Sequence, residues 1–203
     1  MRALSIPTLT LLLAAHPLAA EDLPANAREQ MAGAVAPAPA DLRNGAAILG
    51  YSEDHRLITL REGSGDLICL ADDPRDERFH VACYFKALEP FMARGRELRA
   101  QGMERDEVRS TREKEIKEGT LEMPLGPTAL YSLTCPQGCF DPVTATATGA
   151  NRVHVVYIPY ATQETTGLSP TPATGTPWLM SPGKPWAHIM LVQPAEEESE
   201  AKE

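Results

Sequence analysis

The sequence has few aromatic residues and no excess of basic charge. Phenylalanine, tryptophan and tyrosine make up 5% of the 203 residues and are spread along the chain. This distribution argues against a cavity lined with stacked aromatic side chains. The formal net charge is -9 at pH 7, whereas a protein that binds nucleic acid usually carries a basic surface. We therefore expect no nucleic-acid partner.

Long apolar runs are missing as well. The apolar run at residues 9–15 is much shorter than the roughly 20 residues of a transmembrane helix. It lies between a basic residue, Arg2, and the small residues Ala19 and Ala20, which is the order of parts in a secretory signal. We predict a signal peptide over residues 1–20, cleavage near Ala20, a periplasmic or secreted location, and no transmembrane segment in the mature chain.

The familiar catalytic motifs are absent from the sequence. No serine lies in a Gly-x-Ser-x-Gly elbow, no glycine-rich phosphate loop is present, and no histidines have the spacing of a His-Glu-x-x-His site. These absences favour a protein without catalytic residues, and we expect no cofactor.

Four cysteines are present, and in an exported chain an even number favours disulfides over free thiols or a zinc site. Four cysteines allow three connectivities. Cys69 and Cys83 lie in two strand-like runs joined by a polar segment, so their pairing is favoured, and it would stabilise the fold by about 3 kcal/mol. Cys135 and Cys139 enclose a Pro-Gln-Gly turn and form the simplest second pair.

The chain divides into four parts by composition. Residues 21–44 are rich in alanine and proline and are expected to form a flexible leader, and residues 195–203 form an acidic tail expected to be disordered. Residues 45–194 are predicted to form a single globular α+β domain. Runs of β-forming residues favour strands at 46–51, 56–62, 66–71, 79–84, 128–133, 152–160 and 186–192.

A helical hairpin is predicted over residues 86–118. Its first half has apolar residues three and four positions apart, Gly102 ends it, and a second helix follows from about Arg105 to Glu118. The predicted fold is an antiparallel sheet of about five to seven strands, beginning as a meander, with this hairpin packed on it.

Residues 161–185 form a long segment in which 14 of 25 residues are threonine, proline or glycine. Long ordered loops of this kind are often functional. Trp178 and Trp186 flank a Pro-Gly turn within and beside this segment. We interpret the loop and the two tryptophans as a candidate contact surface.

Three histidines, His80, His154 and His188, fall in predicted strands. If these strands share a sheet, the three imidazoles could meet at one metal ion. A metal-dependent enzyme with Glu89 or Asp73 as its base is therefore one alternative.

Six short motifs occur in this chain order: Arg-Glu-Gly at 61–63, Cys69, Asp-Asp-Pro at 72–74, Cys83, Pro-Trp-Leu-Met at 177–180 and Pro-Trp-Ala-His-Ile-Met at 185–190. This pattern resembles that of a family of uncharacterised exported bacterial proteins. Members of that family typically have Gly-Trp-x-Cys before the acidic Asp-Asp-Pro loop. This chain has Gly65, Asp66 and Leu67 in place of the Gly-Trp part. The resemblance implies that Cys69 pairs with Cys83 and that the strand containing His188 belongs to the core, and it brings no activity or ligand.

These observations favour an exported, disulfide-stapled, non-catalytic protein that binds an unknown ligand or an envelope partner. The metal-dependent alternative uses the three strand histidines. A second alternative is a thiol-disulfide redox protein that works through Cys135 and Cys139, although their spacing is not the Cys-x-x-Cys of thioredoxin-like centres.

Overall fold

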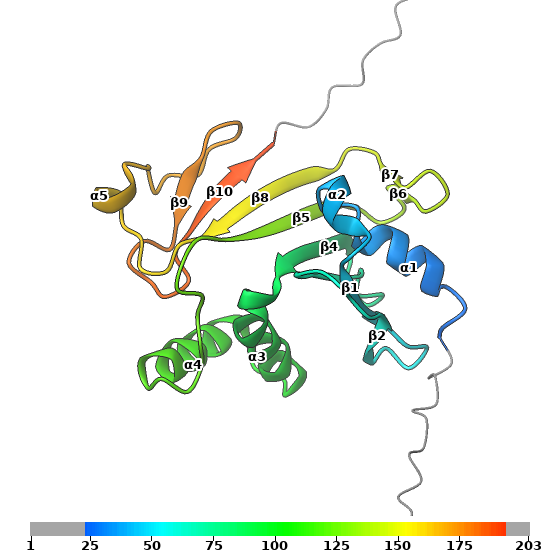
Figure 1. Ribbon diagram of the computed structural model, residues 1–203, viewed down its shortest axis with the longest axis horizontal. Coiled ribbons are helices and arrows are strands. Elements are labelled where there is room, and N and C mark those ends of the chain that lie inside the picture. The colour runs from blue at the N-terminus through cyan, green and yellow to red at the C-terminus, as the bar shows by residue number, and fades with distance from the viewer. Residues whose placement is uncertain (1–22, 194–203) are drawn as a thin grey trace, which may run out of the picture.

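An eight-stranded sheet runs through the protein in the order β2-β1-β3-β4-β5-β8-β10-β9 (Figure 1). The computed structural model describes residues 23–193, so the predicted signal peptide and acidic tail lie outside the described residues. Neighbouring strands are antiparallel except β1 and β3, which are parallel. The strands are β1 (Ala47–Tyr51), β2 (Leu57–Arg61), β3 (Leu67–Leu70), β4 (Arg78–Phe85), β5 (Thr128–Pro136), β8 (Asn151–Tyr157), β9 (Trp178–Met180) and β10 (His188–Val192).

The α+β class is confirmed, but the predicted number of strands is wrong. The sheet has eight strands because β9 forms within the segment that the sequence indicated as a loop. Strands β6 (Phe140–Asp141) and β7 (Thr146–Ala147) form a separate two-stranded sheet. The predicted meander is also wrong at its start, because β2 pairs with one side of β1 and β3 with the other.

The segment expected to be a flexible leader is folded. It forms α1 (Ala27–Ala34) and α2 (Ala40–Arg43), and four of its alanines are buried in the core: Ala27, Ala34, Ala36 and Ala38. Ala34 is fully buried beside Cys69 and Cys83. Small alanine side chains let the backbone of this segment approach the sheet closely. Composition alone does not distinguish such a packed segment from a flexible linker, because both are rich in alanine.

The predicted hairpin is present with a different first turn. Residues Lys86–Leu88 form a 3-10 helix (η1), followed by α3 (Glu89–Ala100) and α4 (Arg105–Lys117). Gly102 adopts a φ of 84° between the two helices, a conformation that favours glycine. Arg94 of α3 forms an ion pair of 2.6 Å with Glu115 of α4, which fixes the helices to each other.

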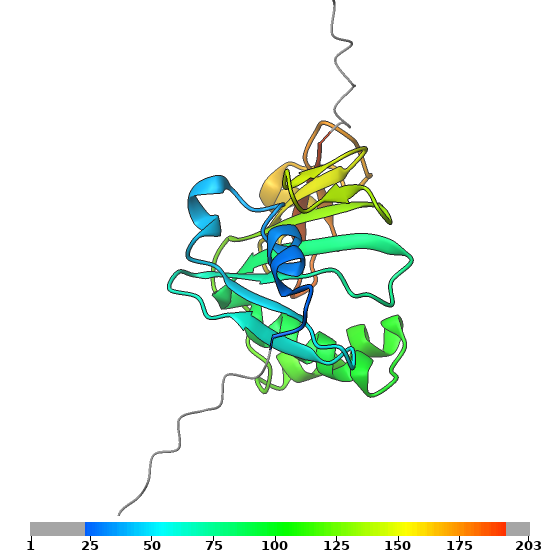
Figure 2. The same cartoon turned by 90° about the vertical axis from the view of Figure 1, so that its right-hand side faces the viewer.

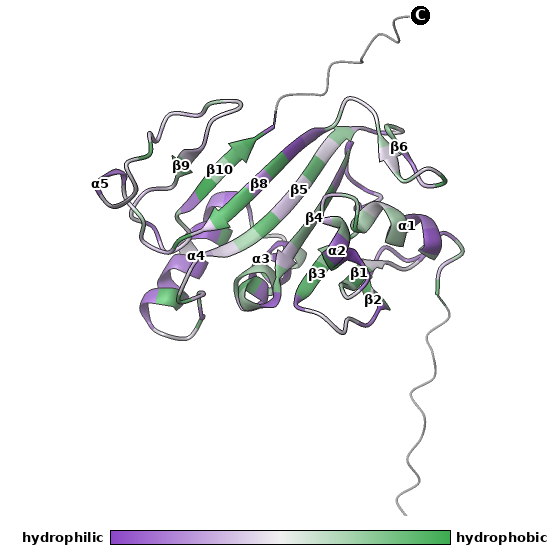
Figure 3. Cartoon of the chain, turned by 45° about the horizontal axis from the view of Figure 1, so that its top comes forward, coloured by the Kyte–Doolittle hydropathy of each residue, from purple (hydrophilic) through white to green (hydrophobic). Residues whose placement is uncertain are grey.

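Helices α1 and α2 cover one face of the sheet, and the hairpin of α3 and α4 lies against the other (Figures 1 and 2). Ile48, Cys69 and Cys83 are cross-strand neighbours that pack under α1 and α2. Ile68 and Tyr84, one residue out of phase, pack with Leu88 on the other face. Figure 3 shows that α1 and α2 lie over the half of the sheet that contains β1 to β4. Among residues 23–193, no helix has the length and apolar character needed to cross a lipid bilayer.

Candidate ligand-binding groove

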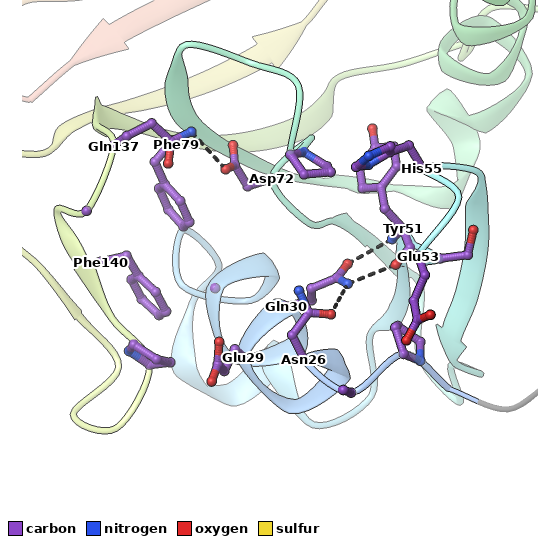
Figure 4. A pocket seen from close by; sticks show the side chains of 17 residues that line it. Asn26, Glu29, Gln30, Tyr51, Glu53, His55, Asp72, Phe79, Gln137 and Phe140 are labelled. Atoms are coloured by element: carbon purple, nitrogen blue, oxygen red, sulfur yellow. Dashed lines mark hydrogen bonds between the residues drawn. The ribbon is translucent and has the colours of Figure 1, made fainter.

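A groove with a volume of about 460 Å³ lies beside α1 (Figure 4). Its walls come from α1, the turn between β1 and β2, the connection between β3 and β4, and the loop between β5 and β6. This volume falls within the range of small-molecule sites. The lining includes the carboxylates of Glu29, Glu53 and Asp72, the amides of Asn26, Gln30 and Gln137, and the rings of Tyr51, Phe79 and Phe140.

One wall of the groove is a pair of stacked phenylalanines. The rings of Phe79 and Phe140 are nearly parallel, with an interplanar angle of 6° and centroids 5.2 Å apart. Gly33 of α1 allows this approach, because a Cβ at that position would lie 3.2 Å from the Phe79 ring and 3.5 Å from the Phe140 ring. The expectation that stacked aromatics line no cavity is therefore wrong. The stack joins β4 to β6, which lie far apart in the sequence.

Gln30 fixes α1 to the end of β1. Its side-chain amide donates to the Tyr51 carbonyl at 2.9 Å, and its amide oxygen accepts the Tyr51 N–H at 2.8 Å. The same amide also donates to Asn26 Oδ1 at 2.9 Å. These contacts hold Tyr51 at the groove, where burial, reinforced by the Asp73 carboxylate, raises the pKa of its phenol to about 12. Tyr51 is therefore a neutral hydroxyl at physiological pH.

Asp72 presents a half-buried carboxylate to the groove. Its Oδ1 accepts the backbone N–H of His80 at 2.7 Å, and its Oδ2 accepts the side-chain amide of Gln137 at 3.3 Å. Burial is the main cause that raises the pKa of Asp72, opposed by these two hydrogen bonds. Within the described part of the chain, no lysine or arginine lines the groove.

Arg75, which follows Asp72 by three residues, pairs with Asp73 and does not line the groove. Its guanidinium binds Asp73 through two contacts, of 2.8 Å and 2.6 Å. This pairing lowers the pKa of Asp73. Asp73 is therefore a partner of an arginine and does not have the free carboxylate that a general base needs.

The structure contains two disulfides, Cys69–Cys83 and Cys135–Cys139, which are the pairs favoured by the sequence. Cys69 and Cys83 are direct neighbours on β3 and β4, and both are completely buried. Cys135 is also buried, whereas Cys139 is half-buried. The second disulfide closes the loop between β5 and β6, which carries Gln137 at the edge of the groove.

The three strand histidines do not come together. His154 pairs across the sheet with Tyr131, whereas His188 pairs with Tyr157, three positions further along β8. Because side chains alternate between faces along a strand, His154 and His188 point to opposite faces. His80 lies at the far end of β4, opposite Thr134. Among residues 23–193, no three His, Cys, Asp or Glu side chains are placed to share a metal ion, so the predicted three-histidine site is wrong.

His80 also lacks the arrangement of a catalytic triad. Its Nε2 lies 3.2 Å from Ser132 Oγ, but Asp72 accepts the main-chain N–H of His80 and not a ring N–H. Glu89, the other candidate base, binds Arg96 at 2.7 Å and accepts the Tyr84 hydroxyl at 2.5 Å. These contacts make Glu89 part of a structural network between β4 and α3.

The two tryptophans do not form a contact surface. Trp178 is 6% exposed on β9, and Trp186 stacks on Phe91 of α3 with centroids 6.2 Å apart. Both indoles help to close the core, because their large apolar area favours burial. The loop around them contains α5 (Gln163–Thr166) and β9, and its longest exposed run extends from Ser169 to Pro177.

The groove is not predicted by any motif in the sequence. In the acidic segment at residues 72–77 only Asp73 was considered for a chemical role, and no function was attached to Asp72, Gln30, Tyr51 or Gln137. The stacked ring of Phe140, directly after Cys139, is a local signal that could have been used. Comparisons of the chain with protein-family models, with curated proteins and with solved structures find no match.

Proposed function

We propose that this protein is an exported, non-catalytic binding protein whose groove takes a cationic group carried on an apolar body. The observation that carries the proposal is the Asp72 carboxylate, which is half-buried in a groove whose lining, in the described part of the chain, contains no lysine or arginine. A carboxylate withdrawn from water gains most from an ammonium or guanidinium partner. Glu29 and Glu53 add negative charge at the exposed edge of the groove.

The aromatic lining supports an apolar body next to the charge. The Phe79–Phe140 stack offers a flat hydrophobic wall, and the Tyr51 ring lies elsewhere in the same lining. Aromatic rings attract cations through their negative faces and attract apolar groups through area burial. A ligand with a ring or alkyl chain and a terminal amine matches both features.

The proposal includes an extracytoplasmic location for the protein. Two disulfides are compatible with an oxidising, extracytoplasmic compartment. The signal peptide predicted from residues 1–20 supports export, and sequencing the N-terminus of the protein secreted by its host tests that prediction. We expect the mature chain to begin after Ala20.

Calorimetric titration with three related probes tests the binding proposal. Benzylammonium carries both the charge and the ring, benzyl alcohol keeps the ring without the charge, and methylammonium keeps the charge without the ring. We expect benzylammonium to bind best. Asp72→Asn should weaken its binding by roughly ten- to a hundredfold, since a hydrogen bond to a charged group contributes about 1.5–3 kcal/mol.

Asp106→Asn is the matched control, because Asp106 is an exposed carboxylate on α4 outside the groove. This variant should bind benzylammonium as the unmodified protein does. Equal affinity for benzylammonium and benzyl alcohol, or no effect of Asp72→Asn, would show that the groove does not select cations.

A further inference from the structure

The Cys135–Cys139 disulfide connects two sides of the groove wall. Cys135 of β5 lies directly opposite Phe79 of β4 in the sheet register. Cys139 immediately precedes Phe140, whose ring stacks on Phe79. The covalent bond therefore joins the neighbour of one ring to the neighbour of the other, and it restricts how far the two rings can separate.

The same bond positions the polar side of the groove. Gln137 lies inside the loop that the disulfide closes, and its amide donates to Asp72 Oδ2 at 3.3 Å and to the Asp76 carbonyl at 3.1 Å. Gly138 adopts a φ of 80° in this turn, and Cys139 N–H donates to the Pro136 carbonyl at 3.2 Å. A closed turn keeps Gln137 next to the Asp72 carboxylate.

The two disulfides differ in how easily a reductant reaches them. Both sulfurs of Cys69–Cys83 belong to completely buried residues, whereas Cys139 is half-buried and follows the exposed residues Gln137 and Gly138. Thiol-disulfide exchange requires a thiolate to reach one sulfur of the bond. Cys139 is the most exposed of the four cysteines and therefore the one that a reductant reaches most easily.

We propose that the Cys135–Cys139 disulfide is a redox switch that holds the groove in its ligand-binding shape. This inference rests on the proposed function and adds its regulation. A dithiol thiolate attacks the Cys139 sulfur, the disulfide breaks, and the Cys135 sulfur leaves as a thiolate that takes up a proton. The second thiol of the reductant then resolves the mixed disulfide. The products are two cysteine thiols and the oxidised, cyclic reductant, so two electrons pass to the protein.

The experiment treats the full mature protein with increasing dithiothreitol and identifies reduced cysteines by alkylation and mass spectrometry. We expect Cys135 and Cys139 to be alkylated before Cys69 and Cys83. At that stage the magnetisation transfer between the Phe79 and Phe140 ring protons should disappear from NMR spectra. Benzylammonium affinity should fall by roughly tenfold, since the wall and the Gln137 contact are both lost.

Two variants separate this switch from a general loss of structure. Cys135→Ala/Cys139→Ser should bind benzylammonium weakly and should no longer respond to dithiothreitol. Cys69→Ala/Cys83→Ala keeps the groove disulfide and should still respond. An unchanged ring contact and unchanged affinity after selective reduction would overturn the switch. If no oxidised form binds benzylammonium, the proposed function fails, and the ring contact alone still decides whether reduction alters the groove.

Discussion

His188 is buried and uncharged, which makes the stability of the protein depend on pH. Its side chain lies in β10 at 9% exposure, and its Nδ1 donates to the Trp186 carbonyl at 2.7 Å. Burial lowers the pKa of His188 below its usual value of 6.5, although the Trp186 carbonyl opposes this effect. The unfolded chain therefore binds more protons than the folded protein in the window just below pH 6.5, and the free energy of unfolding rises with pH there.

We expect full stability above about pH 6.5 and a progressive loss as the pH falls through the folded-state pKa. Urea unfolding at pH 5 and pH 7.5 measures this difference. His188→Gln keeps a side-chain donor for the Trp186 carbonyl and removes the titration, so its stability should change less between the two pH values. His55→Gln, at an exposed turn residue, is the control and should keep the pH dependence. A variant at His188 that retains the full pH dependence would assign it to other groups.

Single residues of the groove were the hardest features to predict from the sequence. Gly33, Phe79 and Phe140 come together because α1 packs against the stacked rings of β4 and β6. No local sequence pattern predicts such a contact between distant segments. The cysteine pairs were predicted because spacing and compartment restrict them. The prediction of a three-histidine site was wrong because membership of one sheet does not place side chains on one face or at one level.

At the scale of elements, the two disulfides should contribute differently to stability. Cys69–Cys83 closes a separation of 14 residues and joins β3 to β4, whereas Cys135–Cys139 closes a separation of 4. The chain-entropy model assigns about 3 kcal/mol to the longer loop and about 2 kcal/mol to the shorter one. Cys69→Ala/Cys83→Ala should therefore lower the free energy of unfolding more than Cys135→Ala/Cys139→Ser does.

Guanidinium unfolding of the two double variants, compared with the unmodified protein, measures both losses. The buried position of Cys69 and Cys83 against Ala34 adds a packing loss to the first variant, in the same direction as the entropy difference. A larger loss in the Cys135→Ala/Cys139→Ser variant would mean that the groove loop stabilises the fold beyond its own closure.

Helices and strands whose apolar residues recur at a regular spacing were predicted well, and those without such a spacing were missed. The seven apolar runs became β1, β2, β3, β4, β5, β8 and β10, and the charged segment after β4 became α3 and α4. Strand β9 was missed because Trp178–Met180 is only three residues long and follows a proline-rich stretch. Helices α1 and α2 were missed because alanine and proline are read as linker residues when their burial is unknown.

At the scale of the whole molecule, the groove exists only because distant segments pack around the β1–β4 half of the sheet. The strand order places the β1–β2 turn, the β3–β4 connection and the β5–β6 loop around α1. This strand order depends on the parallel pairing of β1 with β3. The spacing of apolar residues in the sequence does not indicate whether two strands pair in parallel. The α+β class could therefore be predicted from the sequence, whereas the site could not.

The segment before β1 should be essential for folding and not merely a tether. Deleting residues 21–44 removes α1 and α2, and it leaves Ile48, Leu60 and the Cys69–Cys83 disulfide without the alanine layer that covers them. Uncovering several core side chains, at about 1.5–3 kcal/mol each, costs an amount comparable with the 5–15 kcal/mol by which a typical domain is stable. We expect the shortened protein to lose its near-ultraviolet circular dichroism and its cooperative thermal transition. A shortened protein that melts cooperatively at the same temperature as the protein without the deletion would instead make this segment the dispensable leader that its composition suggests.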